Sequence, residues 1–466
     1  MLFSTFDYFC FLPLVAVAHW KLGTTRARAA LILLASMLFY LAWNPVDFLV
    51  LVYVATTGWF AANLMAGLPE ERRNGASWGA AALMLAPLLF YKYAHFALSN
   101  AAAVVPGLEP WVLPKQHLPI GVSFYSFQAL AYVLDVRRGQ APEKDPVRYA
   151  AFLCFFPHLV AGPILRAANL LGQLARDRKL TREDVGYGLF RLGVGLAKKL
   201  LVADVLQQGV VDSVFTDPSA FTGLEVLVAL YAYTLQIYAD FSGYTDFAIG
   251  SARLLGFEIP ENFDRPYQAT SVANYWRRWH KTLSDWVRDY VYYPLGGSRG
   301  AGLRPYMNTM VTLVILGVWH GANWTFVVYG VLHGLAVALN RWWRKRPGWA
   351  EPSGVGLVWR WALTLQFVVV ARILFRADSL TNAAEVWTAL ISRWDTLSFP
   401  RYSHHAWIVL VLGYAVHLSP KAWAVALRAR FLTLPAVAWG AALALVGWAC
   451  VYFGVGDSLT FIYYAF

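Results

Sequence analysis

The chain has 466 residues, of which 58% are hydrophobic and only 14% are charged, and its formal net charge is +12. Soluble domains carry about 25% charged residues, so this composition excludes an ordinary soluble protein and indicates a polytopic membrane protein. The Lys and Arg residues lie in short loops between apolar segments, where they set orientation and meet anionic lipid. Membrane lipid is therefore an expected partner, and nucleic acid is not.

Apolar segments and basic loops alternate regularly through the first third of the chain. Residues 8–20 follow no basic residue and are expected to be an uncleaved anchor. The excess of basic residues near Arg28, Arg72 and Arg137 predicts that these loops face the cytoplasm. The spans between the loops are expected near residues 29–43, 46–66, 78–97 and 118–136.

The next apolar segment, residues 149–165, is interrupted by Pro157, Gly162 and Pro163. These interruptions predict a re-entrant or kinked segment instead of a plain span. Residues 166–184 are charged and predict an amphipathic helix at the surface.

Two acidic residues, Asp240 and Asp246, follow the apolar segment 222–239. Because buried charges are normally paired, they are expected either to cap helices or to pair with Arg253. The alternative is that they belong to a functional site.

Residues 273–297 predict an amphipathic helix at the membrane interface. Helix geometry alone points His280 toward water. The aromatic residues recur at helical spacing and define the expected buried stripe, which consists of Trp279, Leu283, Trp286, Tyr290 and Tyr293.

The chain is organised around residues 305–340, which contain no Asp, Glu, Lys or Arg. One straight helix of this length would measure about 54 Å, against a hydrocarbon core of roughly 30 Å. Two full spans would each be too short, at about 25 Å. The segment is therefore predicted to bend at membrane depth, within His320–Asn323. Histidine at that depth indicates a functional site, although a packing histidine bonded to carbonyl groups is the competing interpretation.

The remaining apolar segments complete an all-α membrane protein with about eleven spans plus re-entrant and interfacial helices. Further spans are expected near 356–375, 405–418 and 434–455, and the whole chain, 1–466, is expected to be one membrane domain. The cysteines Cys10, Cys154 and Cys450 lie in apolar segments, and their spacing suggests neither a metal site nor a disulfide framework. No metal site is expected.

The pattern of polar residues favours an enzyme over a transporter. A buried histidine suits either proton-coupled transport or general-base catalysis. Transporters usually have duplicated halves with matched broken helices, whereas here the polar elements concentrate between residues 240 and 333. No phosphate-binding glycine loop, zincin motif or Ser-His-Asp spacing is present.

Four long motifs occur in a fixed order, densest over residues 118–334: FFPHLVAGPILR (155–166), YADFSGYTDFAIGSARLLGFEIPENFDRPY (238–267), YWRRWHKTLSDWVRDYVYYPLGGSRG (275–300) and LGVWHGANWTFVVYGVLHG (316–334). They closely resemble the membrane-bound O-acyltransferase family, in the bacterial branch that contains the alginate O-acetyltransferase membrane subunit and its D-alanyl-transfer relatives. Two departures are small: Leu316 stands where members often have glycine, and Ser298 where they often have asparagine.

The resemblance implies a helical bundle around a central funnel or tunnel in the bacterial inner membrane. It implies that His320, in the WHG motif, is catalytic and that His280, in the RRWH motif, is the second catalytic residue. It further implies acetyl transfer from a cytoplasmic donor, acetyl-CoA, to an exopolysaccharide such as alginate or cellulose. A periplasmic acetyltransferase and the polysaccharide machinery are the implied protein partners, and no permanently bound cofactor is expected.

The predicted mechanism has His320 as general base on the acceptor hydroxyl, which attacks the donor thioester. His280 and Asn323 are candidates for orienting groups or for stabilising the oxyanion. The candidate substrate-binding residues are Asn323, Trp319, Trp276 and Asp240. The basic cytoplasmic face could attract the phosphates of coenzyme A, although lipid orientation explains the same residues. A proton-coupled exporter and an acyltransferase acting on lipid or teichoic-acid-type acceptors are the alternative functions.

Overall fold

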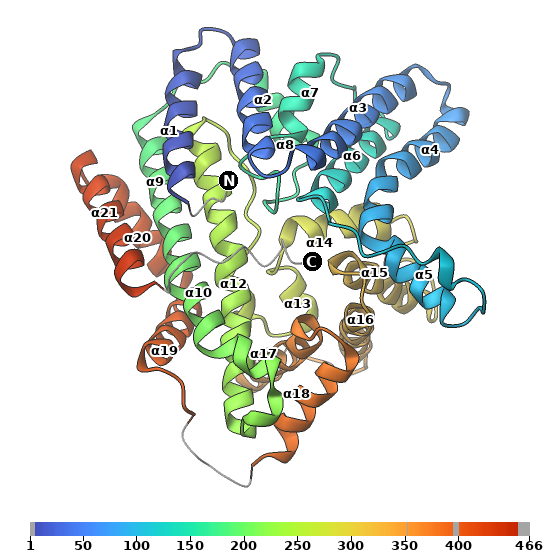
Figure 1. Ribbon diagram of the computed structural model, residues 1–466, viewed down its shortest axis with the longest axis vertical. Coiled ribbons are helices and arrows are strands. Elements are labelled where there is room, and N and C mark those ends of the chain that lie inside the picture. Colours follow the sequence, from blue (N-terminus) through green and yellow to red (C-terminus); the bar gives the residue numbers. More distant parts are fainter. Residues whose placement is uncertain (1–4, 352, 395–399, 455–466) are drawn as a thin grey trace. The chain divides into compact units, whose positions relative to one another are not determined.

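The computed structural model describes residues 5–351, 353–394 and 400–454. Within these ranges the chain forms helices joined by turns and loops, and it contains no β-strand (Figure 1). The prediction of an all-α protein is confirmed for this part of the chain.

The helices belong to two compact units. The first unit contains the chain up to Leu192 together with Tyr244–Pro260, and the second contains Gly193–Gly243 and the chain from Glu261 onward. The single domain expected over 1–466 stays a prediction.

Two helices of the first unit, α2 (Thr25–Leu41) and α3 (Pro45–Gly67), begin after residues whose side chains accept hydrogen bonds from free backbone N–H groups. The Asn44 side chain accepts a hydrogen bond from the backbone of Val46, and the Thr24 side chain accepts one from that of Ala27. The complete helices of this unit are α1 (Phe6–Lys21), α2 (Thr25–Leu41), α3 (Pro45–Gly67), α4 (Glu70–Leu88), α5 (Ala94–Ala102), α6 (Val122–Arg137), α7 (Pro146–Leu153) and α8 (Ala167–Leu174). Helices α9 (Arg182–Leu196) and α12 (Gly223–Leu254) each contribute one end to it.

The interrupted segment 149–165 is not one helix, as its proline and glycine residues predict. Helix α7 ends at Leu153, and residues 154–165 form turns that are almost entirely buried. Gly162 is required there, because a side chain at this position would lie 2.6 Å from the Cβ atom of His158. The surface helix expected over 166–184 is shorter than predicted: α8 has only 8 residues and an irregular segment follows it.

The second unit contains the remaining helices. They are α10 (Asp204–Leu206), α11 (Asp212–Thr216), α13 (Val272–Trp276), α14 (Lys281–Val287), α15 (Arg304–His320), α16 (Trp324–Arg344), α17 (Val355–Arg376), α18 (Leu380–Ser392), α19 (His404–Leu418), α20 (Lys421–Thr433) and α21 (Ala436–Phe453). Segments of π-helix join α9, α10 and α11 and extend α14, and short 3-10 turns lie between other elements.

The uncharged central segment forms a helical hairpin with its break at the predicted place. Helix α15 ends at His320, α16 begins at Trp324, and the two helices pack against each other (Figure 1). Two glycines allow this close packing: a Cβ atom on Gly317 would lie 2.9 Å from the Cα atom of Gly330, and one on Gly330 would lie 2.7 Å from the carbonyl oxygen of Leu313. The position of the bend is therefore confirmed, and its depth in the membrane stays a prediction.

Residues 273–297 do not form the single amphipathic helix expected from their periodicity. Helix α13 ends at Trp276, and α14 begins only at Lys281, after a turn. The aromatic stripe is buried up to Tyr290, but Tyr293 is 58% exposed because the backbone has passed into a π-helical turn before it. The prediction was wrong about the continuity of the helix and about Tyr293.

By length and composition, four helical stretches of the described chain could cross a membrane. A fifth candidate is the bent pair α19 and α20, whose axes differ by 95°. The four single stretches are Pro45–Gly67, Glu70–Ala102, Val355–Arg376 and Ala436–Phe453. The larger number of about eleven spans stays a prediction.

Candidate functional site

His320 is the last residue of α15 and lies in a cluster of aromatic rings. It is 2% exposed. Its ring centroid lies 5.1 Å from that of Trp319 and 5.0 Å from that of Phe375 on α17, and the rings of Phe326 and Tyr329 on α16 lie within 6.5 Å. The imidazole is therefore held by three helices of one unit, at the point where the hairpin turns.

His280 is also buried, contrary to the prediction that it points to water. Its side chain is 0% exposed, and its ring centroid lies 4.7 Å from that of Phe241 and 6.0 Å from that of Trp319. Trp319 thus contacts the rings of both predicted catalytic histidines. Burial lowers the pKa of His280 to about 3, so this imidazole is uncharged at cellular pH.

The backbone explains why His280 turns inward. Its φ angle of 43° is in the left-handed region, which ends the helical periodicity on which the prediction relied. Two hydrogen bonds hold the turn against an earlier loop. Lys281 donates its backbone N–H to the carbonyl oxygen of Asn262, and the Thr282 hydroxyl donates to the side-chain oxygen of Asn262 at 2.6 Å. A local pattern could not reveal a turn that depends on residues so far back in the chain.

His333 and Trp276 extend the cluster along α16. The indole Nε1 of Trp276 donates a hydrogen bond to Nδ1 of His333 at 3.2 Å, and the ring of Tyr329 lies between the two histidines of the hairpin, 4.3 Å from that of His333. The Nε2 atom of His333 is buried and has no hydrogen-bond partner within the described chain. Trp276, a predicted substrate-binding residue, is thus bonded to a histidine of the cluster.

Arg372 is a member of this cluster that the sequence analysis missed. It lies on α17, is 1% exposed, donates a hydrogen bond to the Tyr275 hydroxyl at 2.7 Å, and lies over the rings of Trp279 and Phe375. The groups around its charge in the described chain are tyrosines and not carboxylates, and its Nε has no hydrogen-bond partner there. A buried charge without a counter-charge is costly. The signal was available in the sequence, because an arginine well inside an apolar segment indicates a functional site.

The other two candidate residues have structural partners. The Asn323 side chain caps α16 by accepting from the backbone N–H of Thr325, and it donates to the carbonyl oxygen of Asp378 at 2.7 Å. Asp240 is buried and pairs with Lys199 at 2.9 Å, and Lys199 also contacts Asp204 at 2.8 Å.

Neither Asp240 nor Asp246 pairs with Arg253, so this one of the two expected alternatives was wrong. Arg253 pairs with Asp184 and Glu258 instead, and Asp246 pairs with Arg191. The expectation that the two aspartates are paired was nevertheless correct.

A basic groove of about 700 Å³ reaches the cluster at Trp276. Among its lining residues Asp285 is the single acid, and it pairs with Arg288 at 2.6 Å. The lining cations are Arg277, Lys281, Arg288, Arg341, Arg344 and Lys345. The groove therefore has an excess of positive charge next to a buried set of histidines, which suits a ligand with several phosphates.

Comparison with known proteins identifies the family. The model of the membrane-bound O-acyltransferase family matches residues 89–347, which include His280, His320 and His333. The chain belongs to this family. It is accordingly a multi-pass membrane protein of an acyltransferase family, as the motifs predicted.

Several bacterial relatives share most of the chain. The probable alginate O-acetylase AlgI of Azotobacter vinelandii is 39% identical over 406 residues, which are 85% of this chain and 80% of the relative. The peptidoglycan O-acetyltransferase of Helicobacter pylori is 30% identical over 84% of this chain and 80% of its own length. The teichoic acid D-alanyltransferase of Bacillus subtilis is 26% identical over 55% of this chain and 68% of its own.

Proposed function

We propose that this protein transfers acetyl groups from cytoplasmic acetyl-CoA to hydroxyl groups of an exopolysaccharide such as alginate or cellulose, with His320 as general base. The observation that carries the proposal is a buried imidazole at the turn of the α15–α16 hairpin, ringed by aromatic side chains and lying within the region that the acyltransferase family model matches. The names of the relatives support a polymer as acceptor, since they act on alginate, peptidoglycan and teichoic acid.

In the proposed mechanism, His320 accepts the proton of the acceptor hydroxyl as its oxygen attacks the thioester carbonyl carbon. The carbon–oxygen bond forms, the tetrahedral intermediate collapses, and the carbon–sulfur bond breaks. The imidazolium then returns the proton to the departing thiolate, so the products are the ester and free coenzyme A. His280, which is neutral and contacts the same tryptophan as His320, orients the reacting groups.

Arg372 supplies positive charge for the oxyanion that develops during acyl transfer. It lies over Phe375, with the guanidinium carbon 5.2 Å from the ring centroid, and Phe375 is 5.0 Å from the ring of His320. The guanidinium and the imidazole are therefore at most about 10 Å apart, and both are buried. Fixed charge in such a site acts strongly on a developing negative charge. This role gives a reason for a buried cation that has tyrosines and no carboxylate around it in the described chain.

The basic groove is the proposed binding site for the phosphates of the donor. Its six cations far outnumber its acid, and Trp276 links its wall to the histidine cluster. Arg341, Arg344 and Lys345 directly follow the uncharged segment 305–340, and the excess of basic residues after an apolar segment favours the cytoplasmic side, where acetyl-CoA is available. A bundle of about eleven spans around a funnel would place the site between the cytoplasmic donor and an acceptor on the outer side of the inner membrane, where a periplasmic acetyltransferase partner and the polysaccharide machinery are the proposed protein partners.

The proposal is tested with the full chain purified into proteoliposomes and supplied with acetyl-labelled acetyl-CoA and polysaccharide. We expect the unaltered protein to release free coenzyme A thiol and to transfer label to the polymer. The control variant His404→Ala is expected to do the same, because His404 is exposed at the start of α19. His320→Ala is expected to release neither product above background. Label in lipid would instead identify a lipid acyltransferase, and transport of unmodified substrate without thiol release would identify an exporter.

A further inference from the structure

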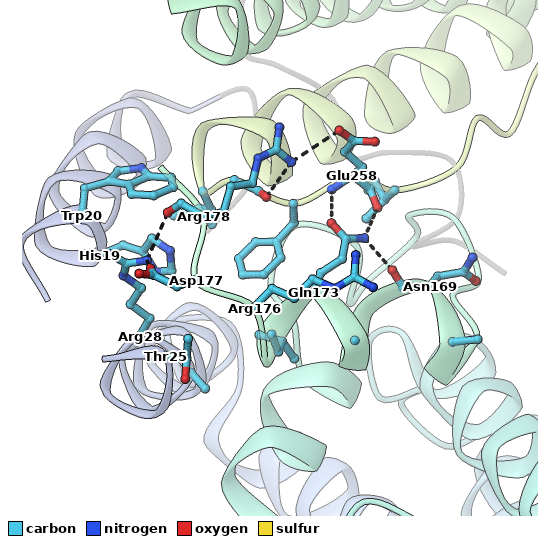
Figure 2. A pocket seen from close by; sticks show the side chains of 18 of the residues that line it. His19, Trp20, Thr25, Arg28, Asn169, Gln173, Arg176, Asp177, Arg178 and Glu258 are labelled. Carbon is cyan, nitrogen blue, oxygen red and sulfur yellow. Dashed lines mark hydrogen bonds and ion pairs between the residues drawn. The ribbon is translucent and has the colours of Figure 1, made fainter. Parts of the chain in front are cut away.

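A cavity of about 730 Å³ lies in the first unit, and none of its lining residues belongs to the histidine cluster. Its walls come from the end of α1, the start of α2, helix α8 with the loop after it, and residues 255–260 (Figure 2). The proposed acetyl transfer gives this cavity no role.

The walls are fixed by hydrogen bonds between distant segments. The Gln173 side chain and the backbone of Glu258 bond each other twice, at 2.8 and 2.9 Å (Figure 2). The Trp20 indole donates to the carbonyl oxygen of Leu254 at 2.8 Å. Gly256, at φ +82°, lets the chain approach this indole, because a Cβ atom there would lie 2.8 Å from the ring. Because these hydrogen bonds fix the walls, a ligand would bind with little ordering cost.

The charges on the walls leave one arginine in excess. Arg28 pairs with Asp177 at 2.9 Å, and Arg178 pairs with Glu258 at 3.3 Å (Figure 2). Arg176 also lines the cavity and is exposed, and its side chain forms no hydrogen bond or ion pair with any residue of the described chain. The cavity thus presents one uncommitted guanidinium, the group best suited to bidentate recognition of phosphate.

A second observation points to a ligand. His19 lines the cavity and is only 2% exposed, yet its Nδ1 atom is buried without a hydrogen-bond partner in the described chain. Such an atom is costly unless something bonds it. The rings of Trp20 and Phe257 flank this imidazole, with centroids 5.1 and 5.9 Å away. The site therefore combines a cation and an unsatisfied polar atom with an apolar aromatic wall.

We propose that this cavity binds a phosphate ester. The phosphate oxygens accept hydrogen bonds from Arg176 and from Nδ1 of His19 in the tautomer that carries a proton there. The positive N-terminal end of α2, which begins at Thr25 in the cavity wall, adds to the attraction. The apolar part of the ester lies against Trp20 and Phe257.

Two sources supply this chemistry: the headgroup of an anionic phospholipid and a soluble phosphate ester such as a nucleotide. The loop between α1 and α2 is predicted to lie at the cytoplasmic membrane surface, where both are available.

The test uses the full chain in nanodiscs and measures the midpoint of thermal unfolding. One arm compares discs of phosphatidylcholine alone with discs of an equal mixture of phosphatidylcholine and phosphatidylglycerol. The other titrates inorganic phosphate and ADP into the phosphatidylcholine discs. Each arm includes Arg176→Gln and a matched control, Lys179→Gln, which removes an exposed cation three residues along the same loop that does not line the cavity.

Stabilisation of the unaltered protein is expected in at least one arm, because a ligand that binds only the folded state raises its unfolding midpoint. Arg176→Gln is expected to weaken binding about tenfold, the effect of losing a charge-assisted hydrogen bond, and Lys179→Gln is expected to respond as the unaltered protein does. A response to phosphatidylglycerol alone identifies the lipid source, and a response to phosphate or ADP identifies the soluble source. No stabilisation in either arm, or equal responses of the two variants, would overturn the proposal.

Discussion

Replacing Gly317 with alanine should displace His320 and reduce acetyl transfer. An added Cβ atom would overlap the carbonyl oxygen of Phe326 and lie 2.9 Å from the Cα atom of Gly330. Ordinary contact begins at 3.4 Å, so the two helices must separate by at least about 0.5 Å, the difference between these distances. His320 lies one helical turn after Gly317 and moves with it. Since a misplacement of about 1 Å can cost 10²-fold in rate, we expect a loss between about tenfold and a hundredfold.

The expected change in stability follows from two opposing terms. Overpacking against a backbone lowers the free energy of unfolding by about 1–3 kcal/mol, and replacing a helical glycine with alanine raises it by about 1 kcal/mol. Gly317→Ala should therefore destabilise the protein by up to about 2 kcal/mol. Gly334→Ala is the matched control on the same hairpin. Its Cβ atom would meet the Met310 sulfur at 2.7 Å, and that flexible side chain can move away, so activity and stability should be retained.

Both variants are assayed in the same membranes. Acetyl incorporation into polymer is divided by the amount of protein in the membrane, and thermal unfolding in detergent gives the relative stability. Full activity and stability of Gly317→Ala would refute the argument that close helix contact positions His320. An equal loss in Gly334→Ala would do the same, because it would assign the effect to glycine in general.

Three further substitutions test the cluster and its surroundings. His320→Ala should reach the membrane at near-normal abundance and lose about 10² to 10⁴-fold in the rate of acetyl transfer, whereas His333→Ala should lose less. Normal acetylation by His320→Ala would eliminate His320 as the base, and absence of that variant from the membrane would indicate a packing histidine. Arg372→Met should lose transfer without losing thermal stability, because it removes a buried charge that has no carboxylate beside it in the described chain. A large drop in the unfolding midpoint would show a structural role instead. Lys199→Met leaves two buried aspartates without their cation, which should lower the free energy of unfolding by about 3–5 kcal/mol. Membrane abundance and the unfolding midpoint should both fall, and unchanged values would contradict the importance of this ion cluster.

Features that depend on neighbouring residues could be predicted from the sequence, whereas features that depend on distant residues could not. The turn at His320–Asn323 and the interruption at Pro157–Pro163 were predicted, because proline, glycine and charge-free length act over a few residues. The orientation of His280 was predicted wrongly, because its left-handed backbone depends on hydrogen bonds between the turn and Asn262 and not on its neighbours in the sequence. Asp240 was expected to be paired, but its partner, Lys199, lies 41 residues earlier in the chain.

The sequence by itself determined that this is an all-α membrane protein of a known acyltransferase family, with a helix break at a histidine. Composition, apolar length and contiguous motifs carry that information, since each is a property of neighbouring residues. Only the tertiary structure decided which rings surround His320 and that Arg372 lies beside them, 52 residues further along the chain. The physical reason is that burial and ring contacts arise when helices pack, and packing joins residues that no local pattern connects.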